Sequence, residues 1–119
     1  MLAIAVLLAG CNFALRRWLD HPGENQVIRV ESGERIYFDL EEDPAAGRQW
    51  YATSDDADVL VKVDHHADDR VAKVELRIHR GYDGPSTVNF RYRRSGEAKP
   101  LKEFTITLYK RTGDVAFWE

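Results

Sequence analysis

The sequence predicts an all-β domain, a sandwich of about seven short antiparallel strands. Short runs of β-branched and aromatic residues recur along the chain, and within each run apolar and polar residues alternate. Such alternation places one face of a strand in a core and the other in solvent. Turn signals separate the runs at intervals of about 8 to 12 residues, as in a sandwich, and no stretch after residue 20 has helical periodicity.

The expected strands follow one another without a long interruption. The clearest is 71–78, where apolar and charged residues alternate throughout, and a later strand has Val88, Phe90 and Tyr92 on one apolar face. Ser32-Gly33 and the segment from Gly81 to Pro85 are turn signals between strands. The seven predicted strands are 27–30, 35–40, 49–53, 59–63, 71–78, 87–93 and 104–109.

Composition limits the classes of partner and the domain count. The chain has 119 residues, 44% of them hydrophobic, which suits one core and is too short for two. Its formal net charge of -3 gives no overall attraction to nucleic acid or to an acidic membrane surface. Because Cys11 is the single cysteine, no intramolecular disulfide can form. We expect a monomer that binds no nucleic acid.

The first eleven residues resemble an export signal that ends in a lipidation site. Met1 precedes nine uncharged, mainly aliphatic residues and then Cys11. This run is too short to span a bilayer and fits the apolar region of a secretory signal, although no Lys or Arg precedes it. The quartet Leu8-Ala9-Gly10-Cys11 is similar to the bacterial lipobox. That resemblance implies acylation of Cys11, which would anchor the protein in the bacterial envelope, and Asn12 resembles the sorting residue of outer-membrane lipoproteins.

Three segments are therefore expected. They are a signal peptide at 1–10, a lipidated N-terminus and tether at 11–25, and a sandwich domain at 26–119 that ends in a short tail. The alternative for the first segment is a buried strand or helix in which Cys11 packs as a small apolar residue. In the tail, Phe117 and Trp118 either dock on the sandwich or are exposed; the sequence leaves both open.

The segment 43–50, Asp-Pro-Ala-Ala-Gly-Arg-Gln-Trp, joins two predicted strands. Pro44 restricts one φ angle and Gly47 permits a positive one, so composition alone indicates a tight turn.

The segment 43–50 also resembles the N-P-T-T-G-x-x-W signature of the chagasin family, inhibitors of papain-like cysteine peptidases. Downstream, the order G-P-S-T-V-N-F-R-Y-R-R, a loop and E-F-T-I-T-L-Y is similar to the last two strands of that family, with Arg94 at the arginine of its R-P-W/F motif. The resemblance covers about residues 26–111 and implies an immunoglobulin-like sandwich.

The resemblance also implies a mechanism, in which three loops at one end of the sandwich fill the peptidase cleft without a covalent bond. Trp50 would support the central loop from the core, and Arg94 would reach polar groups on the cleft rim. Carried over by position, the central loop comprises Asp43, Pro44, Ala45, Ala46 and Gly47. The second loop comprises Tyr92, Arg93, Arg94, Ser95 and Gly96. The third, 64–70, contains His65, His66 and Asp68.

The chain departs from the family pattern in all three loops. Ala45 and Ala46 replace the two threonines and Asp43 replaces the asparagine, which removes two hydroxyls and adds a charge. Ser95 and Gly96 follow Arg94 where the family has Pro and an aromatic residue, and the third loop lacks the family's G-x-G-G. Since a sandwich can be kept while its loops change use, these departures weaken the inhibitory interpretation more than the fold.

The sequence gives little support for a metal site, for enzyme activity or for nucleic-acid binding. His65, His66, Asp68 and Asp69 could supply ligands to a divalent ion, but adjacent histidines point to opposite faces of an extended chain and no second cluster completes a shell. We expect a solvated turn and no metal or other cofactor. No nucleophile with a base, paired acids or phosphate loop is recognisable, so we expect no enzyme activity. The basic and aromatic run 91–94 could suit single-stranded nucleic acid, but alternation makes it a solvated strand face.

These observations give one leading hypothesis and one alternative. The first is an envelope lipoprotein, facing the periplasm from the outer membrane, that binds and inhibits papain-like cysteine peptidases through its loops. The alternative is a non-inhibitory sandwich lipoprotein that uses the same end to bind another envelope protein. The sequence does not identify the peptidase.

Overall fold

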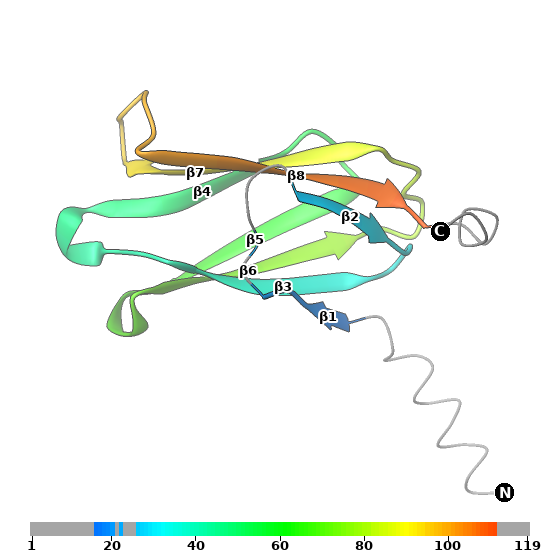
Figure 1. Cartoon of the computed structure of the whole chain (residues 1–119), viewed down its shortest axis with the longest axis horizontal. Coiled ribbons are helices and arrows are strands. Elements are labelled where there is room, and N and C mark those ends of the chain that lie inside the picture. The colour runs from blue at the N-terminus through cyan, green and yellow to red at the C-terminus, as the bar shows by residue number, and fades with distance from the viewer. Residues whose placement is uncertain (1–15, 21, 23–25, 112–119) are drawn as a thin grey trace, which may run out of the picture.

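The computed structural model describes residues 16–20, 22 and 26–111, and these residues form an all-β sandwich (Figure 1). The signal segment with Cys11, most of the predicted tether and the tail with Phe117 and Trp118 lie outside the described residues. The strands are β1 (Arg16–Trp18), β2 (Gln26–Val30), β3 (Arg35–Glu41), β4 (Arg48–Ser54), β5 (Val59–His66), β6 (Val71–Ile78), β7 (Ser86–Arg94) and β8 (Lys102–Lys110). Two short 3-10 turns, η1 (Pro44–Ala46) and η2 (Ala67–Asp69), lie between strands.

The strands form two four-stranded sheets packed face to face. Sheet 1 has the order β1-β3-β6-β5, and sheet 2 has the order β2-β8-β7-β4. Neighbouring strands within each sheet are antiparallel except at one edge, where β1 runs parallel to β3 and β2 runs parallel to β8. Each sheet is thus mixed.

The core lies between the inner faces of the two sheets. In β6 the burial alternates along the strand, so that Ala72, Val74, Leu76 and Ile78 are buried and the residues between them are not. Phe38 of sheet 1 meets Phe90 of sheet 2 edge to face, with ring centroids 5.5 Å apart. The members of the buried hydrophobic cluster are spread along the sequence between Ile28 and Leu108. Residues 12–119 therefore contain every described strand and the whole described core, so removing residues 1–11 takes away none of them.

The predicted all-β sandwich is confirmed, but its details differ from the expectation in two respects. The described chain has eight strands, because Arg16–Trp18 forms β1 inside the segment expected to be a tether. The expectation of purely antiparallel strands is also wrong, since β1 and β2 make parallel pairs. Parallel partners are distant in sequence, and alternation within a strand carries no information about its direction relative to a neighbour.

The loops β3–β4, β5–β6 and β7–β8 lie at one end of the sandwich, which we call the loop end (Figure 1). Backbone hydrogen bonds support this grouping, because Glu42 N–H donates to the Arg70 carbonyl at 2.9 Å. Strand β1 pairs with Arg35–Tyr37, in the half of β3 that is remote from this end. Among the described residues, no helix has the length and apolar character to cross a membrane.

Candidate functional site

The central loop at the loop end is a self-contained 3-10 turn. Asp43 precedes the turn, and its Oδ1 accepts a hydrogen bond from Ala45 N at 3.2 Å. Gly47 ends the turn at φ +73°, in the left-handed region that glycine adopts without steric cost, and its N–H donates to the Pro44 carbonyl at 3.0 Å. Aspartate at position 43 thus supplies the capping acceptor that asparagine would supply. Ala45 is exposed at the tip.

Trp50 holds the base of the central loop. Its indole Nε1 donates to the Glu41 carbonyl at 2.8 Å, and its ring packs on Tyr92 and Phe104 with centroids 5.1 and 5.4 Å apart. The side chain is 6% exposed. Tyr92, opposite Trp50 in the β4–β7 register, accepts a hydrogen bond on its hydroxyl from Asp43 N at 2.9 Å. The loop is therefore fixed to both sheets before any partner binds.

A buried carboxylate lies under the loop. Glu42 is 7% exposed, and its Oε2 accepts a hydrogen bond from the backbone N–H of Trp50 at 2.7 Å. The same oxygen lies 2.8 Å from His65 Nδ1, on the neighbouring end of β5. These contacts offset the cost of burying the carboxylate. They tie the central loop to the end of β5.

The second loop is braced against the first. Arg94 Nε donates to the Ala46 carbonyl at 3.1 Å and lies 3.6 Å from Glu97 Oε1. Arg93 stacks over Tyr51 with its guanidinium carbon 4.3 Å from the ring centroid, and its Nη1 donates to the Glu97 carbonyl at 3.2 Å. Ser95 and Gly96 are exposed at the tip. The family resemblance implies that Arg94 extends towards a partner. In the structure, its Nε instead joins the second loop to the central loop.

The third loop is shorter than the sequence indicates. His65 and His66 are the last residues of β5, so they belong to a strand and not to a loop. Only 67–70 turn, with Asp68 inside η2 and Arg70 at φ +54°, a left-handed conformation that is uncommon for a residue other than glycine. Strand alternation points His65 inwards to Glu42 and His66 outwards, so the two imidazoles do not converge.

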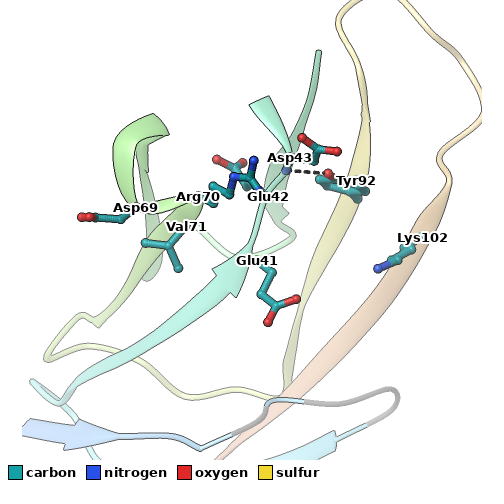
Figure 2. Close-up of a pocket in the computed structure, with 8 residues that line it drawn as sticks. All are labelled: Glu41, Glu42, Asp43, Asp69, Arg70, Val71, Tyr92 and Lys102. Carbon is teal, nitrogen blue, oxygen red and sulfur yellow. Dashed lines mark hydrogen bonds between the residues drawn. The ribbon is translucent and has the colours of Figure 1, made fainter. Parts of the chain in front are cut away.

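A pocket of about 580 Å³ lies at the loop end (Figure 2). It is bounded by Tyr92 of β7 and Val71 of β6, and by charged side chains from the β3–β4 and β5–β6 connections and the adjoining ends of β3 and β8. The charged lining residues are Glu41, Glu42, Asp43, Asp69, Arg70 and Lys102. Across the described part of the chain, no three His, Cys, Asp or Glu side chains come together in a possible metal site.

The sequence-predicted site residues thus gather at one end, but with altered roles. Trp50 lies in the core as expected, whereas Tyr92 is a second buried support, Arg93 and Arg94 are strand residues, and His65 contacts a residue that sequence reasoning missed. That residue is Glu42. It continues the inward-facing series Ile36, Phe38 and Leu40 at period two, which is the signal that could have identified it.

Comparisons with known proteins establish the fold of this chain but not its function. No family model matches the chain, and no curated protein matches it. Among solved structures, it is similar to a cysteine protease inhibitor from Entamoeba histolytica, with a TM-score of 0.66 and 16% identity over 81% of this chain and 95% of that one. It is also similar to the solution structure of Amebosin, with a TM-score of 0.59 and 21% identity over 81% of this chain and 98% of that one. At these identities the likeness establishes a shared sandwich fold.

Proposed function

We propose that this protein is an envelope lipoprotein whose loop end enters the active-site cleft of a papain-like cysteine peptidase and inhibits it reversibly. The central loop would occupy the middle of the cleft, with Pro44, Ala45 and Ala46 facing the catalytic residues. The other two loops would contact the rims. The protein would act as a monomer without a cofactor, held by acyl chains on Cys11 at the outer membrane and facing the periplasm.

The observation that carries the proposal is the rigid mounting of an exposed loop tip. The hydrogen bond that Asp43 accepts from Ala45 fixes the loop internally, and those that Trp50 and Arg94 donate fix it to the core and to its neighbour. A loop that is ordered before binding loses little conformational freedom on binding, which favours affinity. The fold shared with the inhibitor from Entamoeba histolytica supports the same use of the loop end.

The altered loop residues favour recognition by shape. Ala45 and Ala46 offer the cleft methyl groups and backbone atoms but no side-chain hydrogen bonds. The affinity would then depend on how closely the tip fits, and a bulky side chain at the tip should abolish it.

The test is a titration of papain and a cathepsin L-type peptidase with residues 12–119, following residual activity on a small fluorogenic substrate. Saturable, reversible inhibition at nanomolar concentrations is expected. Ala45→Trp should remove it, while Ala57→Trp should not, because Ala57 is also exposed but lies in the β4–β5 turn, at the opposite end of β4. No inhibition at tens of micromolar by folded protein would refute the proposal.

The lipid anchor has its own test. Metabolic labelling with radioactive palmitate should label the full chain in a bacterial host, and Cys11→Ser should abolish the label. Unlabelled wild-type protein would remove the anchor from the proposal and leave the inhibition to be judged separately.

A second candidate function has one specific observation in its favour. Arg94 donates its Nε to Ala46 and pairs with Glu97, so the arginine expected to reach a peptidase is partly engaged within the loop end. A non-inhibitory lipoprotein that binds another envelope protein through the same loops would keep this brace. Folded protein that leaves both peptidases active would favour this candidate.

A further inference from the structure

A row of three arginines crosses the outer face of sheet 1. Arg16, Arg35 and Arg77 are aligned across β1, β3 and β6, and the next position in β5 is Leu60. All four point away from the core, and Leu60 is 60% exposed. We call these four residues the arginine row. Like charges on directly opposed positions destabilise a sheet, and the one carboxylate beside the row, Glu75, contacts two of the three arginines, Arg35 and Arg77.

The adjacent row adds an exposed aromatic residue. Trp18 is 70% exposed, and it stacks on Tyr37 with ring centroids 4.9 Å apart. The same row continues with Glu75 and Lys62. Glu75 Oε2 lies 3.0 Å from Arg77 Nε and 4.0 Å from Arg35 Nη1. The outward side chains of the two rows therefore provide four cations and one carboxylate.

The rest of the face has a different charge pattern. Nearer the loop end, Asp39, Lys73 and Asp64 form a third row in which the signs alternate. At the remote end itself, Asp55, Asp56 and Asp58 make the β4–β5 turn acidic. The excess of positive charge thus lies in the two rows nearer the remote end, which cross sheet 1 from β1 to β5, in a protein whose net charge is -3.

We propose that the arginine row and Trp18 form a contact surface for membranes that contain anionic phospholipids. Arginines bind phosphate oxygens, and tryptophan favours the boundary between headgroups and acyl chains. The chain direction supports a membrane as the occupant. Arg16 is five residues after Cys11, so an acyl anchor there would lie within about 18 Å of Arg16 even with the chain fully extended.

This contact would set the orientation of the domain. The half of sheet 1 that carries β1 would lie against the headgroups, and the loop end, at the far end of the same strands, would stay accessible to a soluble partner (Figure 1). The choice of a membrane as the occupant rests in part on the proposed anchor at Cys11, whereas the surface itself is independent of peptidase inhibition. Vesicle binding measured without Cys11 can therefore fail separately from both the anchor and the inhibition.

The experiment is flotation of residues 12–119, which lack the signal and Cys11, with vesicles of phosphatidylcholine alone or with 30% phosphatidylglycerol. Binding is expected only to the anionic vesicles and should fall at high salt. Arg16→Gln/Arg35→Gln should weaken it by about 30-fold, which corresponds to about 1 kcal/mol per arginine near such a surface. This double variant keeps the 3.0 Å contact between Arg77 and Glu75, and circular dichroism checks its fold.

The matched control is Arg91→Gln/Lys99→Gln, which removes the same charge from exposed positions away from sheet 1. It should bind as the wild type does, whereas Trp18→Ala should bind more weakly. Three results would overturn the proposal: no binding of the wild type to anionic vesicles, equal losses in the two double variants, or binding to single-stranded DNA or heparin with the same variant dependence but not to vesicles.

Discussion

Replacing Trp50 with alanine should destabilise the whole domain. The side chain is 6% exposed and packs on two aromatic rings, so its removal leaves a large cavity, which in protein cores costs about 3 to 5 kcal/mol. It also removes the hydrogen bond from Nε1 to the Glu41 carbonyl, worth roughly 1 kcal/mol. The expected loss of about 4 to 6 kcal/mol is comparable with the entire stability of many domains, roughly 5 to 15 kcal/mol.

Urea unfolding followed by far-UV circular dichroism measures this loss. Tryptophan fluorescence would be harder to interpret, because Trp18 is 70% exposed. The matched control is Tyr51→Ala, next to Trp50 in β4 but facing outwards, where it stacks with Arg93. That variant should lose only about 1 kcal/mol. Equal losses in the two variants would refute the inference that Trp50 supports the loop from the core.

Three further predictions concern single contacts. Glu42→Ala should cost about 1 to 3 kcal/mol in urea unfolding, because it leaves a buried backbone N–H unsatisfied, and His65→Ala should cost less, since 31% of that side chain is exposed. Gly47→Val should cost more free energy in peptidase binding than in unfolding, because it strains the φ +73° position at the loop end. An unchanged inhibition constant would remove this loop from the interface. Hydrogen bonds from Thr87 lower the pKa of Asp55 below its ordinary value, so Asp55 should stabilise the fold at pH values above its unfolded pKa of about 3.9 and lose that contribution as the pH falls through its folded pKa. Asp55→Asn should reduce the acid dependence of the melting temperature, and an identical pH profile would contradict this assignment.

The regular strands were predictable because burial in them alternates strictly. The predicted strand 71–78 coincides with β6 (Val71–Ile78), where every second residue is buried against the opposite sheet. Trp50 and the turn at Pro44 to Gly47 were predictable for a similar reason, since an aromatic residue at an inward position and a Pro–Gly pair have strong local preferences.

Strand β1 was not predictable, because contacts distant in sequence hold it in place. Arg17 has Nε 2.9 Å from Glu34 Oε2, and its Nη2 donates to the Arg29 carbonyl at 2.7 Å. Three residues rich in arginine carry no period that would indicate a strand. The roles of His65 and Arg94 were missed similarly, since Glu42 and the Ala46 carbonyl become their neighbours only after the sheets pack.

The parallel pairing of β1 with β3 has a mechanical consequence. Tension applied to the N-terminal end of β1 acts along the strand, so the backbone bonds to β3 are loaded together in shear and do not open one at a time. The Arg17 contacts, the Trp18 ring on Tyr37 and the bond from Leu19 N to the Tyr37 carbonyl at 2.9 Å share the same load. A domain pulled from its N-terminal side should therefore keep this junction intact under forces that would unzip a terminal hairpin.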